Sequence, residues 1–337
     1  MPHLSTRVLQ GLLTLLLTLF GLLLVTFALS AFSPVDRVLQ IVGDHASQST
    51  YDQVRHQLGL DRPLPVQFWH YLQNLAHGDL GTASATGQPV LQDLLHAFPA
   101  TLELATLALI IGAVLGVITG VLCARYAGSP LDLAIRTLTL LGNSVPIFWL
   151  GLLMLALFYA KLQWSAGPGR LDDIWQFTVE PRTGFALVDT WLSGDREAFR
   201  NALSHLVLPV LLLAYYTLAS ITRLTRSACL SEMNKEYILL ARAKGAGEMT
   251  ILLRHVLPNI RGTLLTVIAL AYTSMLEGAV LTETVFSWPG IGRYLTTALF
   301  AGDTTAVMGG TLLIGVCFVL INNLTDLLVR ATDPRVR

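Results

Sequence analysis

The residues that could bind a metal or transfer a proton are scattered along this sequence rather than grouped. Glu277 and Glu283 lie six residues apart, and therefore on different faces of a helix. The chain has no HExxH or GxSxG pattern, no GxxxxGK[ST] nucleotide loop, and no cysteines at a metal or disulfide spacing. We therefore predict no catalytic residue and no cofactor bound by this chain, so the sequence does not indicate an enzyme.

Five of the eight histidines fall in one segment, residues 33–99, which raises the question of a metal site. They are separated by intervals of 11, 14, 7 and 19 residues: His45, His56, His70, His77 and His96. These spacings match no ligand pattern on one short element. We expect solvated loop histidines and no metal ion.

Basic residues do cluster in one place, between residues 223 and 261. This segment holds seven basic and three acidic residues, and it contains Gly245 and Gly247. The stretches 236–240 and 250–256 favour helix, and the two glycines form a hinge between them. A basic, glycine-jointed helix pair is suited to contact a soluble partner, or to touch anionic lipid.

The elements that must position these residues are apolar. The chain is 53% hydrophobic and 13% charged, and a span of the ~30 Å hydrocarbon core needs about 20 apolar residues. Six segments qualify: 8–32, 104–123, 137–160, 203–222, 262–282 and 304–325. The first is too long for the core of a signal peptide, and we expect a retained helix. The predicted fold class is all-α, a polytopic membrane protein with six transmembrane helices.

The distribution of charge predicts the orientation of these spans. If the N-terminus, residues 125–136, residues 223–261 and the C-terminus share one side, that side holds 13 of the 22 Lys and Arg residues but 5 of the 22 acids. By the positive-inside rule it is cytoplasmic. Both termini are then cytoplasmic, as an even number of spans requires.

Two long connections remain on the outer side, residues 33–99 and 161–200. The apolar residues of segment 66–76 fall on one helical face. This predicts a short helix that lies at the membrane interface or packs on the transmembrane ends. The predicted organisation is a first helix (1–32), an outer loop with short helices (33–99), a core with five spans (100–330), and a cytoplasmic tail (331–337).

Polar residues and prolines inside the spans indicate a transport pathway. Pro146 and Pro209 each remove a backbone hydrogen bond and should bend or weaken their helices. A carboxylate in a span usually faces a bundle interior or a water-filled path. We expect Glu277 to line such a path, the alternative being a helix-end acid bonded to a neighbouring span. The other candidate pathway residues are Asn143, Ser144, Trp149 and Glu283.

The pattern ARAKG, followed by VLP that ends at Pro258, resembles a known cytoplasmic loop motif. This motif belongs to the permeases of binding-protein-dependent ABC importers: Glu-Ala-Ala, three residues, Gly, nine residues, Ile-x-Leu-Pro. Ala241, Gly245, Leu257 and Pro258 match it. Leu239, Leu240 and His255 replace the motif's Glu, Ala and Ile. Three further stretches resemble the dipeptide, oligopeptide and nickel branch of the family: 58–84, FPATLELA at 98–105, and LTETVFSWPGIGRYL at 281–295. Residues 183–195 resemble the outer loop of its peptide-type members, including the Sap-type subgroup.

The resemblance implies a MetI-like permease fold and a peptide importer of the inner membrane. The implied partners are a second homologous permease, two cytoplasmic ATPases that bind ATP and Mg²⁺, and a periplasmic binding protein. The residues expected to couple to an ATPase are Glu236, Tyr237, Ala241, Arg242, Lys244, Gly245, Leu257 and Pro258. Polyamine, antimicrobial-peptide or nickel transport is the alternative within the family. A stand-alone secondary transporter or a membrane scaffold is the alternative outside it.

Overall fold

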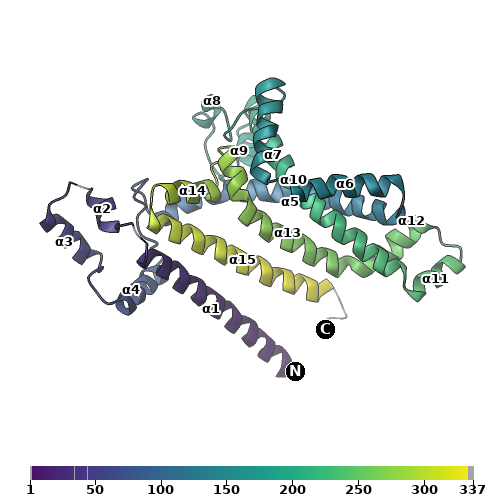
Figure 1. The fold of residues 1–337 in the computed structure, drawn as a ribbon, viewed down its shortest axis with the longest axis horizontal. Helices are drawn as coiled ribbons and strands as arrows, with labels where there is room; N and C mark the ends of the chain where they lie inside the picture. Colours follow the sequence, from purple (N-terminus) through teal and green to yellow (C-terminus); the bar gives the residue numbers. More distant parts are fainter. Residues whose placement is uncertain (1, 34, 44, 333–337) are drawn as a thin grey trace. The chain divides into compact units, whose positions relative to one another are not determined.

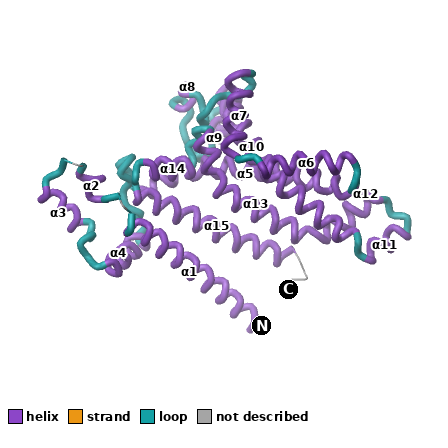
Figure 2. The backbone as a smooth tube through the Cα atoms, viewed as in Figure 1, coloured by secondary structure: helices purple, strands orange, loops and turns teal. Residues whose placement is uncertain are grey.

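The computed structural model describes residues 2–33, 35–43 and 45–332. Most of these residues are helical, and loops join the helices (Figure 2). The described part of the chain has a single isolated β-bridge, between Thr82 and Pro89. The chain forms two compact units, Met1–Phe98 with Arg293–Val319, and Pro99–Gly292 with Leu320–Arg337. The all-α prediction is confirmed for the described part of the chain.

The first unit is built on long helices at the two ends of the chain, with short helices between them (Figure 1). Its elements are α1 (Pro2–Ala31), α2 (Arg37–Val42), α3 (Gln48–Gln57), α4 (Leu64–Ala76), the start of α5 (Val90–Arg125), most of α14 (Ile291–Phe300) and much of α15 (Thr304–Thr332). Helix α4 confirms the helix predicted at 66–76. Its Phe68 packs on Phe20 and Phe27 of α1, with ring centroids 5.9 and 5.1 Å apart, while Trp69 is exposed. One face of α4 therefore packs on a span and the other stays uncovered.

The second unit holds most of the apolar helices and both of the candidate sites described below. Its remaining elements are α6 (Pro130–Ser144), α7 (Ile147–Met154), the π-helix η1 (Leu155–Lys161), α8 (Asp173–Gln176), α9 (Ala186–Leu192), α10 (Arg196–Met233), α11 (Glu236–Ala243), α12 (Glu248–Ile251), the π-helix η2 (Leu252–Val256) and α13 (Leu257–Val285).

All six predicted spans are helical, and one of them is broken. By length and composition, four described helical segments can cross a membrane: Val90–Arg125, Arg196–Met233, Glu248–Leu276 and Thr304–Thr325. A bent pair, Pro130–Gly142 with Ile147–Lys161, makes a fifth if it is one span, and Leu15–Ala31 is a shorter apolar helix. The predicted span 137–160 is thus bent, as expected from Pro146.

The break in this span lies at the proline that the sequence singles out. The two helices of the pair meet at 99°, and Val145 between them is extended (φ −92°, ψ 131°), because a residue that precedes proline disfavours the helical conformation. The freed carbonyl of Val145 accepts a hydrogen bond from the Tyr216 hydroxyl. Pro209, in contrast, lies inside α10 without ending it.

Three glycines of α5 allow that helix to lie against α10 at close range. Gly112, Gly116 and Gly120 recur every four residues, and a Cβ atom on any of them would lie within 2.5–2.9 Å of α10 atoms. Between them, the hydroxyls of Thr119 and Thr222 share a hydrogen bond of 2.6 Å. Small residues at this spacing are typical of tightly packed membrane helices, and this packing forms the wall on which both candidate sites are built.

Candidate coupling site and translocation groove

The segment from α11 to η2 rests on an apolar base, at the end of the α5 and α10 helices where α11 and α12 are labelled in Figure 1. Four of its side chains are fully buried: Ile238, Ile251, Leu252 and Val256. They pack with Val121, Ala124, Cys229 and Ile260 in one cluster. Burying an aliphatic side chain stabilises a fold by about 1.5–3 kcal/mol, so this segment is held firmly although it connects two spans.

The exposed surface of the same segment is unusually apolar. Leu239 and Leu240 are each 57% exposed, and Met249 and Leu253 are 45% and 53% exposed. These four side chains come from α11, α12 and η2. An exposed group of large apolar residues next to charged ones is typical of a protein–protein contact.

The turn between α11 and α12 depends on one glycine and not on the other. Gly245 has φ +83°, and the amide of Ala246 donates to the Ala241 carbonyl at 3.1 Å, while the Gly245 amide donates to Arg242 at 2.9 Å. This is a Schellman cap, which needs a residue in the left-handed region. Gly247 has an ordinary φ of −68° at the N-cap of α12. The predicted hinge is present, with the conformational demand at Gly245.

Ion pairs orient some of the charged residues in and beside the segment. Arg242 donates to Glu248 through both Nε (2.7 Å) and Nη2 (3.1 Å), and these hydrogen bonds raise the pKa of the Arg242 guanidinium above its usual value. Lys235 lies 2.6 Å from Glu232, whose Oε1 also accepts from the Tyr237 hydroxyl at 2.6 Å. The surface therefore presents oriented charges around its apolar residues.

A groove of about 490 Å³ opens between α7, α10 and α13. Its polar lining consists of hydroxyls and one guanidinium, from Tyr216, Thr217, Ser220, Ser274 and Arg223. The rest of the lining is apolar or glycine: Ile147, Leu213, Leu224, Val267, Leu270, Ala271, Met275 and Gly278. Such a surface can solvate a polar molecule without holding it strongly.

Comparison with known proteins decides the family. Residues 116–337 match the family described as "Binding-protein-dependent transport system inner membrane component", and residues 4–105 match its N-terminal companion. The chain belongs to this family. It is 45% identical to the probable D,D-dipeptide transport system permease protein DdpB of Escherichia coli K12, with 96% of this chain and 94% of that protein covered. It is 41% identical to the di/tripeptide transport system permease protein DppB of Pseudomonas aeruginosa, with 95% of each covered.

The fold also resembles that of a solved transporter. A chain of the inward-facing MetNI methionine ABC transporter aligns with a TM-score of 0.54 at 20% identity, over 72% of this chain and 97% of that one. At this identity the likeness concerns the fold, and it agrees with the predicted MetI-like architecture. The protein is thus a multi-pass membrane permease of a binding-protein-dependent transport system.

The predicted coupling residues of this permease lie in one segment, 236–258. Some of them pack against its apolar base, and others are exposed. Ala241 and Leu257 pack against the apolar base. The others are exposed at its surface: Glu236, Tyr237, Arg242, Lys244, Gly245 and Pro258. Sequence reasoning missed Leu239, Leu240, Met249 and Leu253, the large apolar residues of the same surface. A helical run with three consecutive apolar residues, Ile238 to Leu240, was the available signal, because one helix face cannot bury all three.

The predicted pathway residues have different surroundings in the described part of the chain. Ser144 and Trp149 are exposed, and the Ser144 hydroxyl donates to the Leu140 carbonyl at 2.9 Å. The side chains of Asn143 and Glu277 lie outside the described residues. The described lining of the groove includes the hydroxyl residues Thr217 and Ser220 of α10 and Ser274 of α13, for which an unusual density of Ser and Thr in apolar spans was the signal.

Glu283 is fully buried in this structure and does not line the groove. It accepts a hydrogen bond from the Thr101 hydroxyl at 2.7 Å, and a Cβ atom on Gly290 would lie 2.4 Å from its carboxylate. The Thr101 hydroxyl in turn accepts from the Ile291 amide at 2.8 Å. Glu283 therefore holds the turn that follows α13, which accounts for a carboxylate at this depth.

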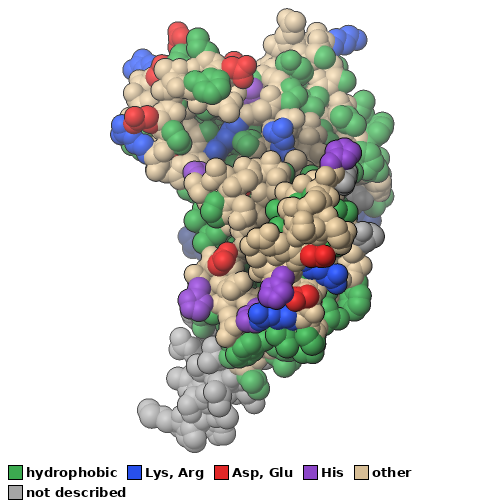
Figure 3. Space-filling view, turned by 90° about the vertical axis from the view of Figure 1, so that its left-hand side faces the viewer, with side chains coloured by type: hydrophobic (Ala, Val, Ile, Leu, Met, Phe, Trp, Pro, Cys, Tyr) green, Lys and Arg blue, Asp and Glu red, His purple; other side chains and the backbone are tan. Residues whose placement is uncertain are grey.

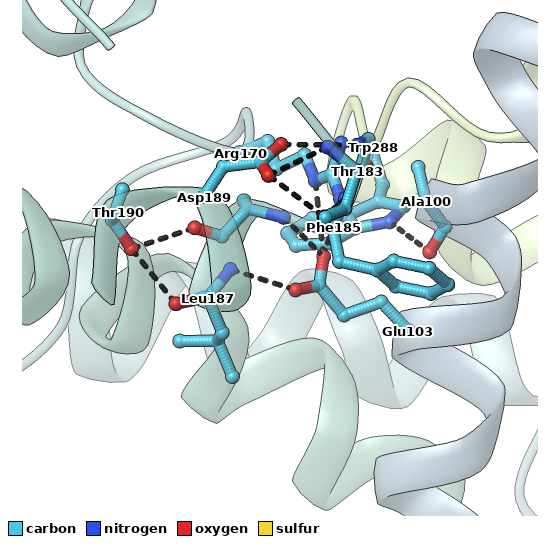
Figure 4. A network of polar contacts seen from close by, with 11 residues as sticks. Ala100, Glu103, Arg170, Thr183, Phe185, Leu187, Asp189, Thr190 and Trp288 are labelled. Carbon is cyan, nitrogen blue, oxygen red and sulfur yellow. Dashed lines mark hydrogen bonds and ion pairs between the residues drawn. The ribbon is translucent and has the colours of Figure 1, made fainter. Parts of the chain in front are cut away.

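A second network, which sequence reasoning also missed, fastens the outer loop 161–200 to the core (Figure 4). The Glu103 carboxylate of α5 accepts from the Leu187 amide at 2.8 Å and from the Ala186 amide at 3.2 Å. It also pairs with Arg170, whose Nη2 donates to the Gly184 carbonyl at 2.7 Å.

Asp189 and Trp288 complete this network. Asp189 accepts from the amide and hydroxyl of Thr183 at 2.8 and 2.7 Å, and the Trp288 indole donates to the Ala100 carbonyl at 2.9 Å. The Arg170 guanidinium lies 5.6 Å from the centre of the Trp288 ring. Residues from the loop, from α5 and from the turn after α13 thus form one network of polar contacts that holds the loop in place.

Proposed function

We propose that this permease is one of two membrane subunits of an ATP-driven importer that carries di- and oligopeptides across the bacterial inner membrane. The observation that carries the proposal is the identity of 45% and 41%, over nearly the whole chain, to permease proteins named for dipeptide and di/tripeptide transport. Its partners would be a second homologous permease, two cytoplasmic ATPases and a periplasmic binding protein. Both termini would lie in the cytoplasm.

The segment 236–258 is the proposed contact with an ATPase. Its buried side chains fix it to α5 and α10, while its exposed leucines and Met249 offer an apolar surface to a groove on the partner. A segment that is rigid at its base and apolar at its tip can transmit a displacement of the partner into the spans. ATP and Mg²⁺ would be bound by the ATPase, in keeping with the lack of a nucleotide loop in this chain.

The groove between α7, α10 and α13 is the proposed wall of half the translocation pathway. Its hydroxyls can exchange hydrogen bonds with the amides of a peptide, and each such bond replaces one with water at little net gain. Weak binding is what a pathway requires, since the cargo must leave it again. Peptides differ in their side chains, and a lining of small hydroxyl residues is tolerant of such differences.

Uptake of a labelled dipeptide by cells that depend on this permease tests the coupling site. Gly245→Asp should abolish uptake while the protein remains in the membrane, because Asp at φ +83° strains the cap and places a charge beside the docking surface. The matched control is Gly247→Asp, where φ is −68° and Asp is a favoured N-cap residue. Normal uptake by Gly245→Asp would refute the assignment.

The cargo is tested with the purified transporter. ATP hydrolysis should rise when the binding protein loaded with a dipeptide is added, and polyamine, an antimicrobial peptide or nickel in place of the dipeptide should not raise it. Copurification adds a separate test of class. A stand-alone secondary transporter or a membrane scaffold would purify without a stoichiometric ATPase.

A further inference from the structure

Helix α2 of the first unit holds an arginine in a fixed position. Asp36 caps the helix by accepting from the Val38 amide at 2.8 Å, Val38 is 1% exposed, and Gln40 donates to the Gly302 carbonyl at 2.6 Å. These contacts bind α2 to the turn between α14 and α15. Arg37 therefore belongs to a built surface and is not a freely moving side chain.

The Arg37 guanidinium is half-buried and lacks an acidic partner among the described residues. Its contacts are the Thr304 hydroxyl, 3.2 Å from Nε, and the Met308 sulfur, 3.7 Å from Nη2. Burial lowers the pKa of this guanidinium below its usual value, although it stays charged at neutral pH. A cation taken out of water without a counter-charge is costly, which points to an anionic ligand.

Arg37 lines a hollow of about 330 Å³ that is rich in hydrogen-bond donors. Its polar lining includes Arg62, Gln67, His56, His70 and Asn74, and no acidic residue among the described lining. The Arg62 Nη1 lies 2.7 Å from His70 Nε2, and since arginine can only donate, this nitrogen accepts. On the face of the molecule that carries α2 to α4, histidine, basic and acidic side chains lie next to one another (Figure 3). Two guanidinium groups facing one hollow favour a phosphate.

An apolar hollow of about 280 Å³ adjoins the first one, between α1 and α15. Met308 lines both hollows, and Thr304, which accepts from Arg37, lines the second. The other apolar lining residues are Leu29, Val35, Leu299 and Val307. A cationic hollow beside an apolar one fits a ligand with a phosphate head and a hydrocarbon tail.

The residues around the two hollows are of the kinds found at the membrane–water interface. Helix α4 contributes Gln67, His70 and Asn74 to the cationic hollow, and on its exposed side it carries Trp69 (59% exposed), Leu64 and Val66. An amphipathic helix with an exposed tryptophan is typical of the interface between headgroups and acyl chains. Helix α1, whose Leu29 lines the apolar hollow, packs on α4 through Phe27 and Phe68.

We propose that this pair of hollows binds one phospholipid of the adjacent leaflet, with its phosphate between Arg37 and Arg62 and an acyl chain in the hollow between α1 and α15. The lipid would supply the counter-charge that Arg37 lacks and would join the interfacial helix to the two spans. The site is independent of the coupling segment and of the cargo.

Native mass spectrometry of the purified, delipidated transporter, with dioleoyl phosphatidylglycerol added back, tests the site. The wild-type chain should retain one tightly held phospholipid, and Arg37→Gln combined with Arg62→Gln should reduce its retention by about tenfold or more. Arg55→Gln is the matched control, because Arg55 is exposed on α3 and does not line the hollow. Equal retention by the double variant and the control would overturn the proposal.

Two further measurements separate the source of the phosphate from a loss of folding. Val307→Phe fills the apolar hollow and leaves both arginines in place, so it should also lose the lipid while keeping the wild-type thermal unfolding temperature of the lipid-free protein. Phosphatidylglycerol should raise that temperature for the wild type, and inorganic phosphate at the same concentration should not. An equal rise with phosphate would show a free-anion site. If the wild type retained no lipid, and the periplasmic binding protein bound the wild type but not the double variant of Arg37 and Arg62, the two arginines would form a protein contact instead.

Discussion

The segment 236–258, which is predicted to be cytoplasmic (the inner segment), and the loop 161–200, which is predicted to lie on the opposite side (the outer loop), both connect spans in the same unit. They are held by different means. The inner segment buries aliphatic side chains and leaves its charges at the surface. The outer loop is held by a buried ion pair between its Arg170 and Glu103 of α5, whose side chains are 17% and 4% exposed, and it leaves large apolar residues such as Phe177 and Trp191 exposed.

This difference separates two mechanical tasks. Apolar packing is non-directional, so a segment held by it stays attached to α5 and α10 when these helices tilt, and moves with them. Hydrogen bonds to a buried carboxylate are directional and costly to break, so the outer loop is fixed in one arrangement. The proposed coupling element benefits from the first property, and a loop that must keep one end of the proposed pathway in shape benefits from the second.

The largest effect should follow from Glu103→Gln, which keeps the size of the side chain and removes its charge. Breaking a buried ion pair on one side costs about 3–5 kcal/mol, and Arg170 would be left half-buried without its partner. Hydrogen exchange of residues 183–195 should accelerate strongly, because Gln keeps only one of the two acceptor oxygens, so the Ala186 amide, the Leu187 amide and Arg170 can no longer all be satisfied. Exchange in residues 236–258 should stay unchanged.

Glu197→Gln is the control for that variant, since Glu197 is an exposed acid in the first turn of α10. It should leave exchange in both regions as in the wild type. If Glu103→Gln accelerates exchange in both regions equally, the two anchors are not independent and the comparison fails.

The next effect should come from Ile238→Ala in the apolar base of the inner segment. Ile238 is fully buried, and truncating such a residue costs about 2–5 kcal/mol, so hydrogen exchange in 236–258 should accelerate while the outer loop is unaffected. Its neighbour Leu239 is 57% exposed. Leu239→Ala should leave exchange unchanged and weaken association with the ATPase. Opposite outcomes for the two residues would place the docking surface on the other face of α11.

Much of the fold followed from local patterns in the sequence. Apolar runs of sufficient length predicted the six helices, the one-face pattern at 66–76 predicted α4, and Pro146 marked the one break. These features depend on the length and periodicity of a single segment. The GxxxG spacing of Gly112, Gly116 and Gly120 was an available local signal as well, and it locates the tight α5–α10 contact.

The sites were harder to predict because they depend on contacts between distant residues. Glu103 and Arg170 are 67 positions apart, and no local pattern indicates that a carboxylate at the start of a span receives a guanidinium from a loop. In the same way, the sequence around Glu283 does not reveal that Thr101 and two glycines enclose it. Whether an acid in a span lines a path or holds a turn depends on the residues that surround it in the folded chain.

A smaller effect distinguishes the two glycines of the inner segment. A Cβ atom at either one would meet nothing within 4 Å, so Gly245→Ala tests backbone strain alone. At φ +83° the alanine should cost about 1 kcal/mol, whereas Gly247→Ser, at φ −68° and at an N-cap where serine is favoured, should change the stability of the segment by about a few tenths of a kcal/mol. Hydrogen exchange of residues 240–250 measures the difference. Equal effects would mean that the Schellman cap does not govern this turn.

The smallest effect should come from Arg242→Gln, which removes the surface ion pair with Glu248. The two side chains are 37% and 31% exposed, and pairs at that exposure contribute about 0.2–1 kcal/mol. The loss in stability should shrink further as salt is added, because salt screens exposed charges, whereas the effect of Glu103→Gln on the outer loop should persist. A large, salt-independent loss of stability from Arg242→Gln would mean that polar contacts also hold the inner segment. The contrast between the two regions would then no longer account for their different mechanical tasks.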